Sequence, residues 1–388
     1  MEQIFKFFLA LVKYDLFDVP LSVPESFSLT EETLEQLYLL AAKHDLAHLA
    51  GDALYKNKLL PKDSSVAAKF QKAQVTALYR YTQLEHEYKQ ISRVLQKTEI
   101  PYIPLKGIII RPFYPQPYLR TSCDIDVLIP EKDLEKAIAQ LTDELHYTWD
   151  GTIQYHDVSL FSPNGFHLEL HFSINETHET MDRLLSQVWE NSSPLEEGSY
   201  EYRQSPEFFM FHQVAHMAYH FLGGGCGIRP LIDLYILRQK MLFDENILQA
   251  FCAQCKLDDF YNYAKLLCDV WFGNASHSDL TLQMENYILH GGVYGNLENS
   301  ITVKRGADQS AFAYIMSRLF VPYKSLKIRY PVLVKHKWLY PFMTVWRWVE
   351  TLSPAKRRRA SAELKQNRYI KKGDQDNMQV FLSQLGLS

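Results

Sequence analysis

The sequence predicts an α+β protein in which a small mixed sheet is flanked by N-terminal and C-terminal helical regions. Over most of the chain, apolar residues recur at three- and four-residue steps, which is the period of an amphipathic helix. Between residues 99 and 180 the pattern changes to short alternating runs separated by Pro, Gly and Asn, which is typical of strands and turns. We therefore expect a helical region over 1–98, a core over 99–180 and a second helical region over 181–388.

The N-terminal region is expected to be helical throughout. The apolar run from Ile4 to Val12 is too short to span a bilayer, so we interpret it as a buried helix. The segment from Ser28 to Glu31 resembles a capping box, which begins a helix by satisfying its free amides. A longer helix is predicted over 64–97, because its apolar residues form one stripe.

The middle of the chain is expected to form the sheet. Strands are predicted over 103–105, 124–129, 154–161 and 166–172, and helices over 108–113 and 131–145. The segment Ser162-Pro163-Asn164-Gly165 predicts a tight turn, because Asn and Gly tolerate positive φ. Helical spacing returns after residue 180, with helices predicted over 208–221, 230–241 and 246–272.

Composition limits the classes of protein to consider. The chain has 388 residues, of which 47% are hydrophobic, so it has ample material for a core. A formal net charge of −4 gives no general reason to expect non-specific nucleic-acid binding. Five cysteines are an odd number, which argues against a disulfide scaffold and fits a reducing cytoplasm. No apolar stretch reaches the length of a membrane span, so we expect a cytoplasmic protein with no membrane partner.

Two aspartates stand two residues apart in the strand predicted over 124–129. Side chains alternate along a strand, so Asp124 and Asp126 point to one face and Ile125 and Val127 to the other. Neighbouring carboxylates repel each other in an apolar setting, and a divalent cation such as Mg²⁺ removes that repulsion. The pair therefore predicts a metal site, with an ordinary solvent-facing pair on an edge strand as the alternative.

The strand predicted over 166–172 alternates without a break. His167, Glu169 and His171 share one face, and four apolar residues share the other. If this strand pairs near Asp124, Glu169 becomes a third carboxylate, and three carboxylates can hold two ions for phosphoryl or nucleotidyl transfer. The alternatives are a transition-metal site made by the polar row alone and an ordinary half-exposed strand.

Basic residues around Gly107 are candidate contacts for phosphate. Lys106-Gly107 lies where a predicted strand gives way to a helix. Glycine permits close approach to the backbone, and the N-terminus of a helix favours an anion. Lys106 would add a positive charge there, and Arg111 or Arg120 would do the same.

The motifs follow one another in a defined order: Leu105-Lys106-Gly107, Tyr114-Pro115, Leu119-Arg120, Asp124 to Ile129, and Leu168-Glu169-Leu170-His171. This order resembles an uncharacterised nucleotidyltransferase family of the polymerase-β-like nucleotidyltransferase superfamily. Helical segments at 212–220, 229–234 and 318–331 are similar to the family's helical regions, so the resemblance extends over most of the chain.

The resemblance implies a nucleotidyltransferase core and an enzyme that uses Mg²⁺ or Mn²⁺. Such an enzyme would move a nucleoside monophosphate from a nucleoside triphosphate such as ATP to a hydroxyl or phosphate acceptor. Asp124 and Asp126 would bind the metal and the triphosphate, and Glu169 would hold an ion or activate the acceptor. The acceptor would be a small molecule, a peptide or an RNA end.

One position departs from the superfamily pattern. Ile108 follows Gly107, so the small hydroxyl that usually contacts phosphate after this glycine is missing. Two alternatives therefore stay open. The same metal site would serve a kinase, in which the γ-phosphorus is attacked instead of the α-phosphorus. Alternatively, the fold would bind a nucleotide or a partner protein without turnover.

Two further groups of residues receive a structural interpretation. His212, His216 and His220 recur every four residues and are expected on a packed helix face near the site, with metal ligation as the alternative. Cys252 and Cys255 have metal-like spacing, but no second pair accompanies them, so buried thiols are expected.

Two charged groups complete the candidates. Arg229 and Asp233 are expected to form a pair one helical turn apart, with the border of an acceptor pocket as the alternative. The basic cluster Lys356 to Arg359 is expected on a solvated helix surface. If that cluster has a binding role, the expected ligand is a phosphate-bearing acceptor such as RNA.

Overall fold

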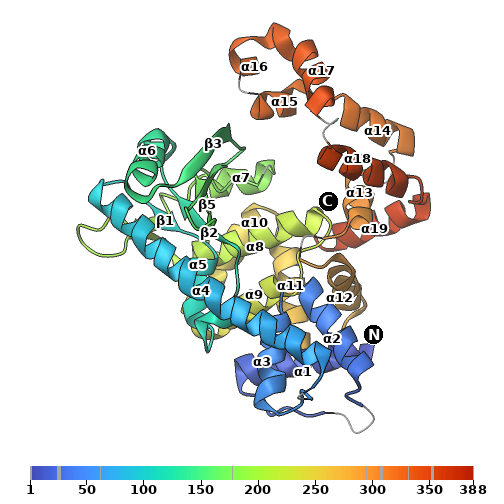
Figure 1. The fold of residues 1–388 in the computed structure, drawn as a ribbon. Coiled ribbons are helices and arrows are strands. Elements are labelled where there is room, and N and C mark those ends of the chain that lie inside the picture. The colour runs from blue at the N-terminus through green and yellow to red at the C-terminus, as the bar shows by residue number, and fades with distance from the viewer. Residues whose placement is uncertain are drawn as a thin grey trace.

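A five-stranded sheet lies toward the upper left in Figure 1, and helices precede and follow it in sequence. The computed structural model describes residues 2–23, 28–61, 63–176, 178–293, 295–305, 309–330, 332–350 and 354–387. Within these residues the predicted α+β class, with a small mixed sheet flanked by helical regions, is confirmed. The division into three regions stays a prediction.

Four helices precede the sheet: α1 (Glu2–Phe17), α2 (Glu31–Lys43), α3 (Ala47–Lys56) and α4 (Ser65–Lys97). The buried helix predicted at Ile4 and the long helix predicted at Ser64 are both confirmed. The capping box predicted at Ser28 is wrong. The side chain of Thr30 caps α2 instead by accepting a hydrogen bond from the Thr33 amide at 3.2 Å, so the cap lies two residues later.

The sheet has the strand order β1-β2-β5-β4-β3. Its strands are β1 (Ile103–Pro104), β2 (Asp124–Leu128), β3 (Thr148–Ile153), β4 (Asp157–Phe161) and β5 (His167–His171). Only β2 and β5 pair in parallel; the other pairs are antiparallel, which makes the sheet mixed. The prediction missed β3, because this edge strand is exposed along its whole length and so lacks the alternation that marks a half-buried strand.

One face of the sheet is covered by two helices. The helix predicted over 131–145 begins as a 3₁₀ turn, η3 (Glu131–Asp133), and continues as α6 (Leu134–Leu145). Ile125 and Val127 of β2 are buried in one hydrophobic cluster with α6 and the C-terminal half of α4, as expected for the apolar face of that strand. The opposite face of β2 is therefore left to Asp124 and Asp126.

Three short elements link β1 to β2: α5 (Gly107–Ile110), η1 (Arg111–Phe113) and η2 (Pro117–Leu119). After the sheet come α7 (Glu179–Leu185), a hairpin of β6 (Ser192–Pro194) and β7 (Tyr202–Gln204), α8 (Pro206–Leu222) and α9 (Arg229–Lys240). The segment predicted over 246–272 is two helices, α10 (Glu245–Gln254) and α11 (Asp258–Phe272). Lys256, between them, has a φ of 57°, a left-handed conformation that ends a helix.

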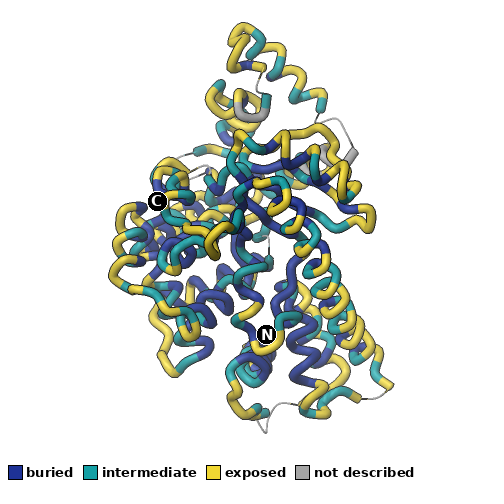
Figure 2. The backbone as a smooth tube through the Cα atoms, turned by 90° about the vertical axis from the view of Figure 1, so that its left-hand side faces the viewer, coloured by how far each residue is buried: buried dark blue, intermediate teal, exposed yellow. Residues whose placement is uncertain are grey.

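The remaining elements are α12 (Asp279–Gly291), α13 (Leu297–Arg305), α14 (Ala311–Leu319), α15 (Tyr323–Arg329), α16 (Val332–Lys335), η4 (Lys337–Leu339), α17 (Tyr340–Glu350), α18 (Pro354–Asn367) and α19 (Lys372–Gln384). Figure 2 shows buried backbone through the centre of the molecule, whereas the elements at the top of that view are mostly exposed. No helix among the described residues is long and apolar enough to cross a membrane.

Helices that precede the sheet and helices that follow it pack into one core. Phe5 of α1 contacts Trp271 of α11 edge to face, with ring centroids 5.6 Å apart, and both side chains are buried in one cluster. All five cysteines are free thiols. Cys252 and Cys255 are buried, which confirms the structural interpretation of that pair.

Candidate active site

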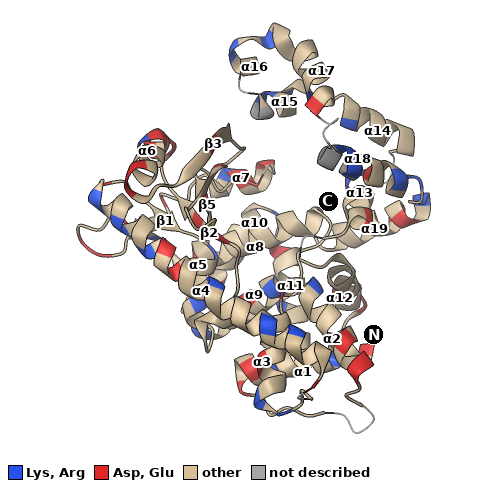
Figure 3. Cartoon of the chain, in the orientation of Figure 1, with Lys and Arg blue, Asp and Glu red and all other residues tan. Residues whose placement is uncertain are grey.

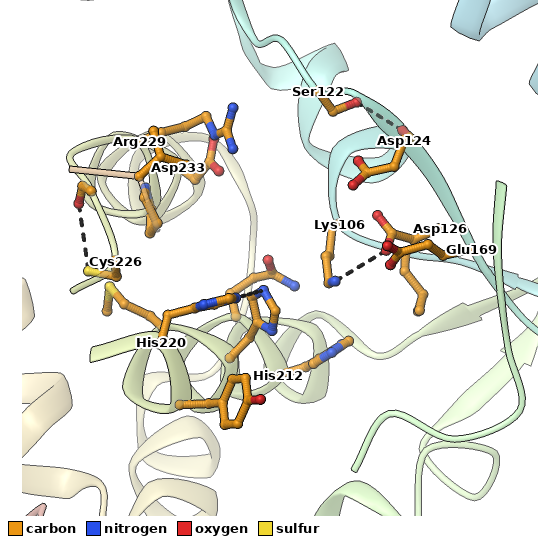
Figure 4. Close-up of a pocket in the computed structure, with 18 of the residues that line it drawn as sticks. Lys106, Ser122, Asp124, Asp126, Glu169, His212, His220, Cys226, Arg229 and Asp233 are labelled. Atoms are coloured by element: carbon orange, nitrogen blue, oxygen red, sulfur yellow. Dashed lines mark hydrogen bonds and ion pairs between the residues drawn. The ribbon is translucent and has the colours of Figure 1, made fainter. Parts of the chain in front are cut away.

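The parallel pairing of β2 with β5 brings the predicted carboxylates together. Asp126 lies opposite Glu169 in the register, so the pairing on which the third carboxylate depended is confirmed. Side chains at paired positions stand on the same face of a sheet. Asp124, two residues before Asp126, points to that face as well, and Figure 4 shows all three carboxylates on one side of a pocket.

Asp126 is buried and contacts two cations of the chain. Its Oδ1 accepts from Lys106 Nζ at 3.2 Å and from His171 Nε2 at 3.1 Å. His171 Nε2 also lies 3.5 Å from Glu169 Oε2. The protein thus supplies internal counter-charges to carboxylates that burial alone would make costly to ionise.

These contacts set the charge state of the site. Burial would raise the pKa of Asp126, but Lys106 and His171 outweigh it and keep that pKa well below its usual range. Burial would likewise lower the pKa of His171, but its bonds to Asp126 and Glu169 raise it to about 9. Burial, followed by repulsion from Asp126 and Glu169, raises the pKa of Asp124. An added cation would relieve the repulsion at Asp124.

The donor atoms fit a hard divalent cation. One oxygen each of Asp126 and Glu169 and one nitrogen of His171 all lie within 4.8 Å of one another. His156, Asp157 and His171 form a second such group, and Asp124 belongs to neither among the described residues. The carboxylate oxygens in this group are donors of the kind that Mg²⁺ and Mn²⁺ prefer.

Gly107 is needed for the packing of Arg120. A Cβ built at Gly107 would lie 2.8 Å from Arg120 Nη1, closer than real contacts allow. Arg120 cannot easily move, because its Nη2 lies 2.9 Å from Asp233 Oδ2 in a buried ion pair. The glycine therefore makes room for a guanidinium group, where the sequence suggested room for a phosphate. The helix that it begins, α5, has only four residues.

Gly107→Ala is expected to destabilise the fold by about 1–3 kcal/mol, because the new methyl group overpacks against a held Arg120. Urea denaturation of both proteins measures the difference. Gly373→Ala is the matched control, because a Cβ there meets nothing within 4 Å. Equal losses in the two variants would contradict the packing role of Gly107.

Ser122 lies beside the Gly107 turn and carries the hydroxyl that the motif lacks. A Cβ on Gly107 would be 3.6 Å from Ser122 Oγ, which in turn donates to the Asp124 carbonyl at 3.0 Å. Arg111 is buried and donates to the same Oγ. Burial, followed by the charge of Arg120, lowers the pKa of Arg111 to about 10. The fold thus brings to this turn a hydroxyl that is distant from Gly107 in sequence.

The pocket has a volume of about 370 Å³, within the size range of small-molecule sites. Of the predicted site residues, the three carboxylates, Lys106 and Arg120 line it, whereas Gly107 and Arg111 are not among the lining residues. The opposite wall comes from α8 and α9 (Figure 4) and includes His212, His216, His220, Arg229 and Asp233.

A family model described as "Uncharacterised nucleotidyltransferase" matches residues 30–273, more than half of the chain. The chain belongs to that family. No curated protein and no solved structure matches it. The match contains the helical segments at 212–220 and 229–234 and ends before the one at 318–331, whose resemblance stays a prediction.

Two contacts on the far wall of this nucleotidyltransferase differ from the prediction. Arg229 does not pair with Asp233: its Nη1 donates to Asp45 Oδ2 at 3.0 Å and to the Thr121 carbonyl at 3.1 Å. Asp233 instead pairs with Arg120, so each partner comes from a different part of the chain. Arg229 and Asp233 are partly or wholly buried, and a buried charge needs a partner. If these two residues paired with each other, Arg120 would be left buried without a partner, so each takes a partner from another part of the chain.

The histidines of the nucleotidyltransferase form part of a chain of polar contacts that the sequence did not predict. Glu176 is buried, and its Oε1 lies 2.5 Å from His216 Nδ1. His216 Nε2 lies 3.1 Å from His220 Nε2. Burial raises the pKa of Glu176 to about 7 and lowers that of His220, helped by Lys106, to about 4. Glu176, His216 and His220 are called the relay below.

Proposed function

We propose that this nucleotidyltransferase moves a nucleoside monophosphate from a nucleoside triphosphate such as ATP to a hydroxyl or phosphate acceptor in a Mg²⁺-dependent reaction. The observation that carries the proposal is the placement of Asp126 opposite Glu169 on parallel strands, with Asp124 on the same face. The five free thiols and a triphosphate substrate favour the cytoplasm as the site of this activity.

In this proposal Asp124, Asp126 and Glu169 hold the metal. A bound Mg²⁺ would neutralise charge on the triphosphate and polarise the phosphoryl oxygens. Lys106 balances Asp126 in the free enzyme and supplies positive charge at the pocket wall for the phosphates. Ser122 links Arg111 to the Asp124 carbonyl beside Gly107. Arg111 and Arg120 support this wall of the pocket and do not contact the phosphates, because Arg111 donates to Ser122 and Arg120 pairs with Asp233.

The chemical step follows from the donor and the acceptor. An acceptor oxygen attacks the α-phosphorus, and a new P–O bond forms. The bond from the α-phosphorus to the oxygen bridging to the β-phosphate breaks, and pyrophosphate leaves with that electron pair. The proton of an acceptor hydroxyl must go to a base, and we propose His220 for this role, on the wall opposite the carboxylates.

The relay determines which proton state His220 presents. With Glu176 ionised, His216 donates through Nδ1 to Glu176 and accepts at Nε2 from His220. His220 then has its remaining nitrogen, Nδ1, free of a proton and able to accept one. With Glu176 protonated, every hydrogen bond in the relay reverses, and Nδ1 of His220 carries a proton instead. Ionised Glu176 is therefore the active form of the relay.

Pyrophosphate release is expected to rise as pH increases through about 7, because Glu176, with its pKa raised to about 7 by burial, ionises there. Charged and titratable neighbours act on this carboxylate: Lys106, His156, His171, Asp182 and His216. Glu176→Gln is expected to remove the rise and to lower release at pH 8 by about 10²-fold. Initial rates from pH 5.5 to 9 measure both effects.

Glu179→Gln is the control for that pH profile, because Glu179 is an exposed carboxylate three residues after Glu176, at the start of α7. His220→Gln should reproduce the loss at pH 8. A profile in Glu176→Gln that still rises through pH 7 would show that another group accepts the proton, and Glu169 would then be tested next.

Product analysis tests the proposed function itself. The full chain is incubated with Mg²⁺ and ATP labelled at either the α- or the γ-phosphate, with water or added hydroxyl compounds as acceptors. Nucleotidyl transfer releases the γ-label as pyrophosphate and leaves the α-label on AMP or an adduct. Release of ADP would instead support the kinase alternative. Magnesium-independent binding of ATP without turnover would support a non-catalytic role.

A further inference from the structure

A strongly basic segment lies outside the residues that match the nucleotidyltransferase family. Residues 311–359 contain eleven Lys and Arg and one Glu, a formal charge of +10. The whole chain carries −4, so its other residues together carry −14. In Figure 3, the parts of α14 to α18 that are not grey carry many basic residues and few acidic ones. Such asymmetry within one chain indicates attraction to an anionic partner.

An apolar stripe runs along the same segment and is exposed. Trp338, Phe342, Val345, Trp346 and Val349 recur at three- and four-residue steps, so they share one face of η4 and α17. Their exposed fractions are 68%, 65%, 51%, 56% and 49% in that order. Contiguous apolar surface of this kind marks an interaction site, since isolated exposed side chains need no explanation but an aligned set does.

The other face of α17 is fixed to the chain, which directs the stripe outward. Trp348 Nε1 donates to the Leu319 carbonyl at 2.8 Å, and Tyr340 Oη donates to the Val321 carbonyl at 2.8 Å. By contrast, no described residue accepts a hydrogen bond from the indole N–H of Trp338 or Trp346. In Figure 1, α15 to α17 stand away from the sheet, which agrees with the exposure of the stripe.

We propose that this surface, the stripe with its flanking basic residues, binds the surface of an anionic lipid bilayer. The exposed lysines and arginines of the same segment are Lys324, Lys327, Lys335, Lys337, Arg357 and Arg358, and Lys335 and Lys337 directly precede Trp338. Apolar side chains on one face of a helix enter the boundary between head groups and acyl chains, and basic side chains pair with anionic head groups. Indole groups favour this boundary, where the ring is apolar and the N–H is wet.

Binding at the bilayer surface needs no membrane-spanning helix. The described residues contain no such helix, and that finding therefore does not bear on surface binding. The expectation of no membrane partner rested on span length alone. Binding at the surface is also independent of the proposed nucleotidyl transfer, because none of these residues lines the active-site pocket.

Two other occupants fit the surface less well. Nucleic acid would match the charge and stack on the indoles, but Val345 and Val349 offer nothing to a base or a phosphate. A second copy of the chain would match the stripe, but two segments of charge +10 would repel each other. A lipid surface uses the aliphatic, aromatic and basic side chains together.

Co-sedimentation tests the proposal. The full chain is mixed with vesicles of phosphatidylcholine alone or with a quarter of phosphatidylglycerol, at low and high salt. Binding is expected to the anionic vesicles and to weaken with salt. Trp338→Ser/Phe342→Ser/Trp346→Ser is expected to lower the partition coefficient by at least about tenfold. Lys335→Glu/Lys337→Glu is expected to lower it for anionic vesicles only.

A matched control removes three equally exposed side chains elsewhere: Tyr55→Ser/Tyr79→Ser/Leu242→Ser, whose residues are 72%, 58% and 92% exposed. This variant should bind vesicles like the wild type. Val345→Ser/Val349→Ser separates the occupants, because it should weaken lipid binding and leave binding of a fluorescent single-stranded RNA unchanged. Circular dichroism verifies that each variant is folded.

Four results would overturn the proposal. The wild-type chain does not sediment with anionic vesicles at low salt, or the stripe and control variants bind equally well. The third is RNA binding that depends on the stripe while vesicles are ignored, which would identify nucleic acid as the occupant. A dimer that the stripe variant converts to a monomer, again without vesicle binding, would identify a second copy.

Discussion

Asp126→Asn is expected to lower pyrophosphate release by at least about 10³-fold, the largest effect on activity that we expect of any single substitution. Asp126 contacts Lys106 and His171, and it lies opposite Glu169 in the pairing of β2 with β5. The neutral amide cannot hold a divalent cation with the same strength, and it leaves two cations of the chain without their shared partner. Initial rates with ATP and Mg²⁺ measure the loss.

The same variant is expected to lose about 1.5–3 kcal/mol of stability at neutral pH, because hydrogen bonds to charged groups are replaced. The pKa of Asp126 is lowered in the fold, so its contribution is present above the unfolded pKa and disappears as pH falls. The difference between Asp126→Asn and wild type should therefore shrink in acid. Glu131→Gln, which removes an exposed carboxylate after β2, is the control. If Asp126→Asn released pyrophosphate at the wild-type rate, the proposed metal site would be ruled out.

Asp233→Asn is expected to destabilise the protein by about 3–5 kcal/mol, the largest structural effect that we expect. Asp233 accepts from Arg120 Nη2 at 2.9 Å and from Tyr114 Oη at 2.7 Å, and all three groups are buried. Removing the carboxylate charge leaves Arg120 buried without a counter-ion beside Arg111. The free energy of unfolding in urea measures the loss.

Three further variants separate the contribution of the Arg120–Asp233 ion pair from that of the hydrogen bond from Tyr114. Tyr114→Phe removes one hydrogen bond and should cost about 1 kcal/mol. Arg120→Met/Asp233→Leu removes both charges and should recover most of the stability lost by Asp233→Asn. If Arg120→Met alone weakens ATP binding without loss of stability, then Arg120 contacts phosphate, as the sequence suggested, and its positioning role is wrong.

Periodicity predicted most of the fold because most elements bury one face. Helix α4 and strand β5 were predicted to within a few residues, since each has a continuous apolar stripe or alternation. Strand β3 was missed because all its residues are exposed and hydrogen bonding to β4 alone defines it. The cap of α2 was misplaced because Ser28 and Thr30 offer the same hydroxyl, and only the backbone conformation selects between them.

The carboxylates of the site were predictable, and their partners were not. Asp124, Asp126 and Glu169 lie in strands whose alternation fixes the face of each side chain. Their roles stay predictions. The relay was missed because Glu176 lies outside any motif, and its contact with His216 joins a loop to α8. One signal was available in the sequence. His212, His216 and His220 recur every four residues in a mostly apolar helix, which indicates that one face of α8 is polar.

The sequence by itself determined the class of fold, the strands that carry the acidic residues and the family resemblance, because these depend on local periodicity and on the order of motifs. Only the tertiary structure decided which charged side chains pair: Lys106 and His171 pair with Asp126, and Asp233 pairs with Arg120. The physical reason is that burial makes an unpaired charge costly, so each buried charge takes whichever partner the fold brings near. Distance along the chain says little about that choice.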